Sequence, residues 1–183
     1  PHVTIFTDSS ERGWRIIAIN NNTGEIIVRG GKWTNPHHIN IKETMAVKIS
    51  VDVVHECFQP FPTSIHWLLD NTTSKSTMEK QRSNSFLINQ VYALAADRIP
   101  PSTMVRVDYI HTKLNPVDPT SRGQDIDPTQ LRCAMMYVSQ LPSVGGGLWC
   151  DPCVFMPDPA QAFVPPPNTF FNPQDYSFPM MCR

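Results

Sequence analysis

The stretch HVTIFTD at residues 2–8 alternates polar and apolar side chains, which is the pattern of a β-strand. Two more runs rich in Ile and Val follow at residues 14–20 and 25–29, and the turn-forming sequence NNNTG at residues 20–24 separates them. We therefore expect three consecutive antiparallel strands. Gly30-Gly31 and Asn35-Pro36 are expected to form the loop that follows.

Beyond this meander, the chain alternates helices and strands. Helices are predicted at residues 41–58, 84–98 and 128–140, and further strands at residues 64–70 and 104–110. Asn40 is the expected N-cap of the first helix, and Asp127 with Pro128 opens the last. The helix at 84–98 is expected to present one apolar face made of Phe86, Leu87, Val91, Leu94 and Ala95.

The element order β-β-β-α-β-α-β-α predicts an α/β fold with a mixed five-stranded sheet and helices on its faces. Strands joined through helices pair in parallel by right-handed crossovers. In such sheets, functional groups collect at the carboxyl ends of the strands. Residues 1–140 are expected to form this domain.

The sequence changes character from about residue 141. Residues 141–183 are dense in proline and also carry many aromatic residues, which solvated linkers usually lack. We expect an extended, largely irregular tail along the domain surface or a partner, away from the acidic residues described next.

Four acidic residues stand at predicted strand ends and helix starts. Asp8 and Asp70 each end an apolar run, while Glu43 and Asp118 lie where helices should begin. Carboxylates alone can hold hard divalent cations, and two such cations about 3.5–4 Å apart can promote an in-line attack on a phosphodiester. The pattern predicts a two-metal site.

The motifs around these acids resemble the ribonuclease H domain of reverse-transcribing elements of the Bel/Pao, Ty3-like and tyrosine-recombinase types. They are DSS at residues 8–10, KETMAV at 42–47, DNTT at 70–73 and NPVDPTSRG at 115–123. The resemblance covers roughly residues 3–123. It implies a ribonuclease H-like fold and cleavage of the RNA strand of RNA–DNA hybrids during reverse transcription.

On this interpretation, Asp8, Glu43, Asp70 and Asp118 bind two Mg²⁺ ions, for which Mn²⁺ can substitute, and the products carry 5′-phosphates. Hybrids are selected by shape and 2′-hydroxyl contacts. The short polar or basic residues expected to contact substrate are Ser9, Ser10, Asn71, Thr72, Asn115 and Arg122. His111, in the loop before Asp118, is a candidate catalytic helper, although a surface histidine is the plainer interpretation.

The charge composition indicates how the chain would bind nucleic acid. The chain has 183 residues and a formal net charge of −1, with its lysines and arginines dispersed, whereas a free-standing nucleic-acid binder usually has a basic excess. We therefore expect much of the affinity to come from a reverse transcriptase polymerase domain, in the same polyprotein or a partner. Pro1 in place of Met suggests a fragment of a longer polyprotein or a trimmed chain.

The compartment is expected to be reducing, cytoplasm or nucleus, because five cysteines at scattered positions do not form a disulfide framework. No apolar stretch is long enough to span a bilayer, so no membrane association is expected. Cys150 and Cys153 resemble half a zinc site, but free thiols are the default because no second pair has the usual spacing.

Each acid also has a structural explanation. Asn40 to Glu43 reads as a capping box, in which Glu43 would only stabilise the helix start. Asp118 followed by Pro119 reads as a helix cap. His37 and His38 are expected to face solvent, and Trp33 is either near the core or a stacking platform for a nucleic-acid strand.

Two rival functions remain open. Another nuclease of the same superfold, such as a Holliday-junction resolvase, would use a similar acidic quartet. A catalytically silent ribonuclease H-like module could instead serve as a scaffold whose tail binds a partner.

Overall fold

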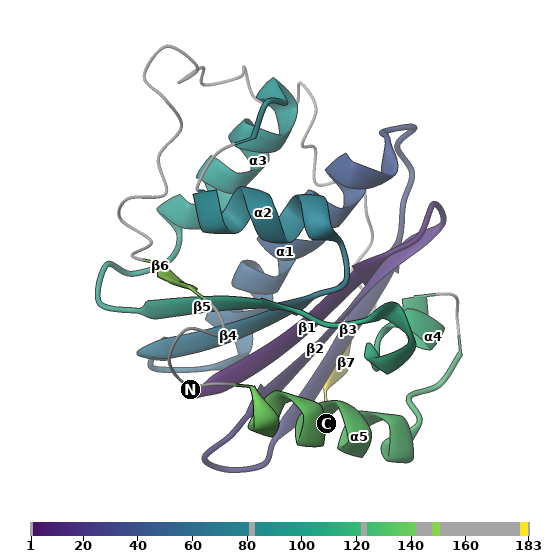
Figure 1. The fold of residues 1–183 in the computed structure, drawn as a ribbon, viewed down its shortest axis with the longest axis vertical. Helices are drawn as coiled ribbons and strands as arrows, with labels where there is room; N and C mark the ends of the chain where they lie inside the picture. Colours follow the sequence, from purple (N-terminus) through teal and green to yellow (C-terminus); the bar gives the residue numbers. More distant parts are fainter. Residues whose placement is uncertain (1, 81–82, 122–123, 142–147, 151–179, 183) are drawn as a thin grey trace.

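The computed structural model describes residues 2–80, 83–121, 124–141, 148–150 and 180–182. One mixed sheet runs through it, with helices on both faces (Figure 1). The strands are β1 (Val3–Ser9), β2 (Gly13–Asn20), β3 (Ile26–Lys32), β4 (Ser64–Leu69), β5 (Met104–Tyr109), β6 (Leu148–Cys150) and β7 (Met180–Cys182). The helices are α1 (Ile39–Cys57), α2 (Thr72–Lys80), α3 (Phe86–Asp97), the 3₁₀ helix η1 (Thr112–Leu114), α4 (Asp118–Ser121) and α5 (Pro128–Gln140).

The sheet has the strand order β6-β5-β4-β1-β2-β3-β7, with β1 at its centre. Strands β1, β2 and β3 form the antiparallel meander, and β4 and β5 run parallel to β1. The predicted α/β fold with five principal strands in the ribonuclease H-like arrangement is confirmed. Parallel pairing places the carboxyl ends of β1 and β4 side by side, because Thr7 of β1 pairs with Leu69 of β4.

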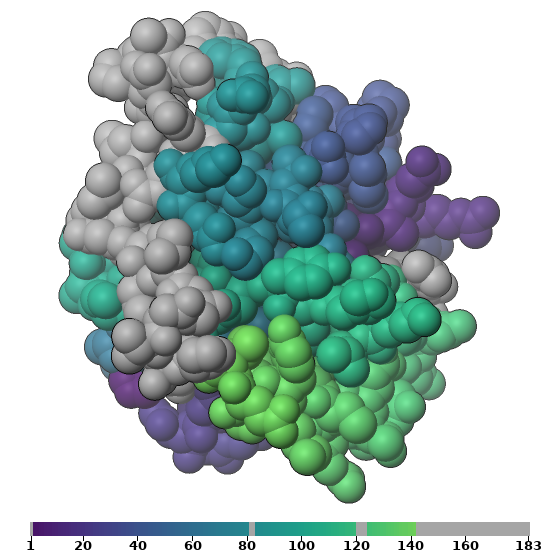
Figure 2. Space-filling model, viewed as in Figure 1, coloured from purple at the N-terminus to yellow at the C-terminus, as the bar shows by residue number. Residues whose placement is uncertain are grey.

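Two apolar layers cover the sheet. Strand residues such as Ile5 and Trp67 pack with α1 and α3 on one face, and Phe6 and Leu68 pack with α5 on the other. In Figure 2, the surface of α2 lies in the upper half of the view and that of α5 in the lower half. Burial on both faces explains why β1 is buried along its whole length.

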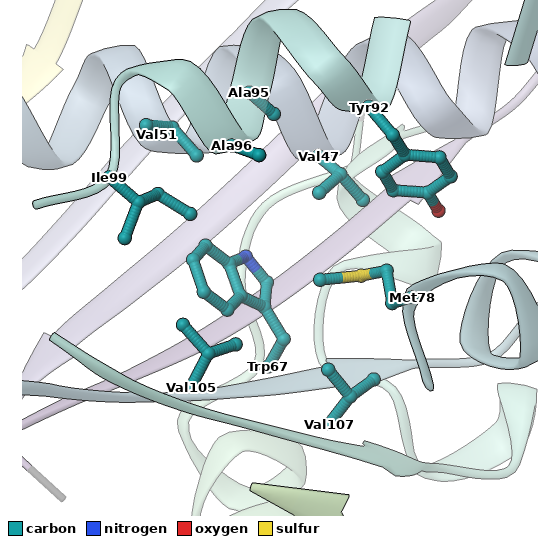
Figure 3. A pocket seen from close by; sticks show the side chains of 10 residues that line it. All are labelled: Val47, Val51, Trp67, Met78, Tyr92, Ala95, Ala96, Ile99, Val105 and Val107. Carbon is teal, nitrogen blue, oxygen red and sulfur yellow. The ribbon is translucent and has the colours of Figure 1, made fainter. Parts of the chain in front are cut away.

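A small apolar cavity of about 30 Å³ lies between α1, α3 and the sheet (Figure 3). Its lining includes Trp67, Met78 and Tyr92, and it has no polar surface. A space of that size holds at most about one or two water-sized spheres, and an apolar lining offers water no partners. The cavity is therefore a gap in core packing and not a binding site.

The structure corrects the prediction of a loop at residues 30 and 31. Gly30 and Gly31 belong to β3 and do not begin a loop. A Cβ atom at Gly30 would lie 1.7 Å from Nη1 of Arg15, because the Arg15 side chain crosses the neighbouring strand, so any side chain at residue 30 would force Arg15 to move. The predicted β2–β3 turn is confirmed, with Gly24 at a φ of +76°.

The helices depart from prediction in two places. Helix α2 was not expected, because its sequence TTSKSTMEK has no apolar period and buries only Ser74, Thr77 and Met78. The predicted apolar face of α3 is right in part. Val91 and Ala95 are buried and Leu87 packs against the core. Phe86 and Leu94 are 43% and 38% exposed, while polar Asn89 and Gln90 are buried. Helix α5 matches its prediction, including the Asp127 cap on Thr129 N–H at 2.9 Å.

Of residues 141–183, the structure describes Leu141 and two three-residue strands, so the largely irregular tail stays a prediction. Strand β6 pairs antiparallel with β5, and β7 pairs antiparallel with β3. Most of the tail, including Cys153, lies outside the described residues. No helix within the described ranges is both long and apolar enough to cross a membrane. The domain boundary at residue 140 stays a prediction.

Candidate metal centre

Two of the predicted acids stand where the parallel strands end. Asp8 is the second-last residue of β1 and is 5% exposed, and Asp70 follows the last residue of β4. Because β1 and β4 are paired neighbours with matching register, their carboxyl ends bring the two side chains to one edge of the sheet.

Helix α1 brings Glu43 to the same edge. Ser9 Oγ donates a hydrogen bond to the Lys42 carbonyl at 3.0 Å, and Lys42 Nζ donates to the Glu11 carbonyl at 2.9 Å. These two bonds join the beginning of α1 to the end of β1 and to the turn after it. Glu43 is 7% exposed as a result.

The capping-box interpretation of Glu43 is wrong. The N-cap of α1 is His38, whose Nδ1 accepts from Asn40 N–H at 3.2 Å, so the predicted cap at Asn40 is also wrong. Glu43 then lies one full turn into the helix, beyond the position from which a glutamate returns to the cap. Its carboxylate is turned toward β1 and lies near Asp8 and the Ser9 backbone N–H, which donates to Asp8 Oδ1 at 2.9 Å.

Carboxylate oxygens of Asp8, Glu43 and Asp70 all lie within 4.8 Å of one another. Burial, followed by the charges of Asp8 and Asp70, raises the pKa of Glu43 to about 10. Burial also raises the pKa of Asp70, to which the charge of Asp118 contributes. Carboxylates held this close disfavour one another's ionisation, and a cation between them removes that cost.

Asp118 completes the predicted quartet at a greater distance. It is the first residue of α4 and borders the same open hollow of about 370 Å³ as the three clustered acids. Figure 2 shows this edge of the molecule, where the β1–β2 turn projects beside the residues that follow β5. Within the described residues, the group whose oxygens lie within 4.8 Å of each other contains three acids, without Asp118.

The donor set fits hard divalent cations. All the carboxylates are oxygen donors, which Mg²⁺ and Mn²⁺ prefer, and sulfur or imidazole ligands are not part of the cluster. The crowding of carboxylates also supports a divalent-cation site, because a cation bound among them would offset their mutual repulsion.

Five of the six residues predicted to contact substrate fall into three groups. Ser9, Ser10 and Asn71 line the hollow beside the acids. The Ser9 hydroxyl already donates a hydrogen bond to the Lys42 carbonyl. Thr72 borders a neighbouring polar hollow of about 800 Å³. Arg122 lies outside the described residues.

Asn115 and His111 have structural roles near the hollow. Asn115 is fully buried, so a direct substrate contact does not fit its place. His111 is the N-cap of η1, where its Nδ1 accepts from Lys113 N–H at 3.2 Å, and the hollow is bordered by Thr112 instead. Trp33 is 8% exposed and packs against Trp14 with ring centroids 6.4 Å apart, so it is not a stacking platform.

Sequence reasoning missed two groups at this edge. Thr112 hydrogen-bonds to Asp70, and its position six residues before Asp118 carried no recognised signal. The polar hollow beside Thr72 is lined by the start of α1, by α2 and by the residues before α3, including Asn40, Lys80 and Ser85. Its serines and threonines could not be placed because α2 was not predicted.

No protein-family model and no curated protein sequence matches the chain. Among solved structures, the chain is similar to ribonuclease H1 from the halophilic archaeon Halobacterium salinarum NRC-1, with 13% identity and a TM-score of 0.48. The match covers 60% of this chain and 83% of the other. A likeness at this level carries no argument about activity, so function must be inferred from the site.

Proposed function

We propose that this chain is an endonuclease that hydrolyses the RNA strand of RNA–DNA hybrids. The observation that carries the proposal is the group of three carboxylates, Asp8, Glu43 and Asp70, whose oxygens lie within 4.8 Å of one another at the carboxyl ends of β1 and β4. Asp118, on the border of the same hollow, is the fourth member of the site.

These four acids would hold two Mg²⁺ or Mn²⁺ ions. Bound there, the ions would supply an activated water and stabilise the leaving 3′ oxygen, which leaves a 5′-phosphate on the product. Asp8 comes from the central strand β1 and would hold the ions together with Glu43, Asp70 and Asp118. No protein nucleophile is required by this chemistry.

Substrate recognition would depend on shape and on sugar contacts, with no reading of base sequence. Ser10 and Asn71 border the hollow and carry short polar groups that suit sugar or phosphate oxygens. Thr72 and the adjoining polar hollow extend this surface beyond the acids. Arg122 belongs to the same proposal through its place in the motif that contains Asp118.

The motif series also supports a setting in reverse transcription, in which a polymerase domain of the same or a partner polyprotein would supply part of the hybrid affinity. The net charge of −1 is consistent with that division of labour, because the chain has no basic excess of its own.

The test is a cleavage assay with end-labelled RNA–DNA hybrid, duplex DNA and a four-way DNA junction, each with Mg²⁺ or with a chelator. We expect cleavage of the RNA strand of the hybrid, with Mg²⁺ only, and 5′-phosphate ends. Asp8→Asn should abolish cleavage, whereas Asp127→Asn, at an exposed acid far along the chain, should not.

The rivals give different results in the same assay. Preferential cleavage of the junction would replace the proposal with a resolvase. Absence of cleavage on all three substrates by a protein that Mg²⁺ stabilises would identify a catalytically silent scaffold.

A further inference from the structure

Asn115 is a fully buried amide beside the acidic cluster. It follows η1 and precedes α4, in the segment that leads to Asp118. A buried amide must have its hydrogen bonds satisfied, because an orphaned polar group costs about 1–3 kcal/mol. Its partners therefore indicate what this side chain holds together.

Those partners lie on three separate segments. The Asn115 Nδ2 donates to the Thr7 carbonyl at 3.3 Å, and Thr7 directly precedes Asp8 in β1. The Oδ1 accepts from Val117 N–H at 3.3 Å, and Val117 directly precedes Asp118. The same side chain hydrogen-bonds to Asp70, after β4.

We propose that Asn115 is a positioning residue for the metal centre, which holds the Asp8, Asp70 and Asp118 segments in one arrangement. The inference rests on the proposed function and adds to it a residue that acts through the ligands without touching metal or substrate.

The chemistry of the amide explains the choice of residue. One amide group offers two N–H donors and one acceptor oxygen, which matches a carbonyl, a carboxylate and a backbone N–H. An aspartate here would add another carboxylate and would lose both donors.

The turn itself does not depend only on this side chain. The Asn115 carbonyl accepts from Asp118 N–H at 3.2 Å and from Gln130 Nε2 at 3.2 Å, and its N–H donates to the His111 carbonyl at 3.1 Å. A serine at 115 keeps this backbone and a short acceptor for Val117, but cannot reach Thr7 and Asp70 together.

The experiment compares Asn115→Ser and Asn115→Ala with Asn89→Ser as matched control. Asn89 is also a buried amide, 4% exposed, which bonds both backbone groups of Ser83 at 2.6 and 2.8 Å, on the loop before α3. Mn²⁺ affinity is measured by calorimetry on the whole chain, together with unfolding temperature and, for hybrid hydrolysis, kcat and KM.

We expect both kinds of variant to lose stability, because each removes buried hydrogen bonds. Only the Asn115 variants should lose Mn²⁺ affinity, by roughly tenfold or more, as is typical when groups that orient metal ligands are removed. In these variants kcat should fall while KM for the hybrid stays the same. A role confined to folding would leave Mn²⁺ affinity and kcat of the folded fraction unchanged.

Wild-type Mn²⁺ affinity in a folded Asn115→Ser or Asn115→Ala protein would overturn the inference and leave the proposed function standing. Equal loss of affinity in Asn89→Ser would also overturn it, because the effect would then be general destabilisation. Failure of the wild-type chain to bind Mn²⁺ would defeat the proposed function and the inference with it.

Discussion

Two sites with buried carboxylates, one around Asp108 and one at the ends of β1 and β4, differ in how their charge is balanced. Asp108 of β5 is 2% exposed, and its Oδ2 lies 2.7 Å from Arg106 Nε and 2.7 Å from His66 Nε2. At the end of β1 and β4, the near neighbours of the Glu43 carboxylate include two further carboxylates, and their charges raise its pKa.

The difference separates a cluster whose charge is balanced within the chain from the proposed metal centre. The Asp108 cluster brings a guanidinium to its carboxylate from within the chain, so its charge balance is complete on folding. The Asp8, Glu43 and Asp70 cluster concentrates like charge, which costs free energy that an external cation can recover. The same substitution should therefore have opposite effects on stability in the two places.

The largest effect on stability is expected for Asp108→Asn. Removing one member of a buried ion pair leaves the other charge in the interior, which costs about 3–5 kcal/mol. Chemical denaturation should show this loss, while the matched change Asp70→Asn should leave metal-free stability equal or higher. Similar losses for both variants would erase the distinction between the clusters.

Glu43→Gln should lower hybrid hydrolysis by more than about a hundredfold, since supporting groups around metal ligands alone account for roughly ten- to hundredfold. The metal-free variant should melt at a higher temperature than the wild type near pH 8, because the wild type must take up a proton on Glu43 to fold at that pH, whereas a glutamine needs none. Steady-state assays and melting curves on the same samples check both parts. Wild-type activity in this variant would exclude Glu43 from the site.

Mg²⁺ should stabilise the wild-type chain, by about 2.7 kcal/mol at a hundred times its Kd. The gain should grow with pH, because the folded metal-free state keeps a proton on Glu43 between its ordinary pKa of 4.5 and about 10, and that state loses stability as pH rises through this window. Melting curves with and without Mg²⁺ at about pH 5.5, 7 and 8.5 measure this. A pH-independent gain, or the same trend in Glu43→Gln, would contradict the assignment.

The smallest effect is expected at Asp127, an exposed carboxylate outside both clusters. Its Oδ1 caps α5 through Thr129 N–H at 2.9 Å, so Asp127→Ala should cost about 1 kcal/mol. Hydrolysis and Mg²⁺ stabilisation should not change. If this variant also impaired metal binding, the response to acid substitutions would not be local to the clusters.

Strong local signals explain what the sequence could predict. Period-two alternation and the Gly24 turn located the meander, and Asp127 with Pro128 located α5 to the residue. The carboxyl ends of parallel strands then predicted the meeting of Asp8 and Asp70.

Features that depend on tertiary contacts escaped prediction. Helix α2 has no apolar period, and β6 and β7 are three-residue strands that depend on the free edges of β5 and β3. Gly30 was assigned to a loop because the crossing Arg15 side chain cannot be read from local sequence. Asn115 was predicted to contact substrate. Local sequence could not show that its side chain bonds to Thr7, which is 108 residues away in the chain.

The central claim is that Asp8, Glu43 and Asp70 form a divalent-metal centre with Asp118. Anomalous scattering from crystals grown with Mn²⁺ tests it most directly. We predict two peaks about 3.5–4 Å apart, within coordination distance of these carboxylates. Crystals with Mn²⁺ bound elsewhere and no peak among the three clustered acids would contradict the claim.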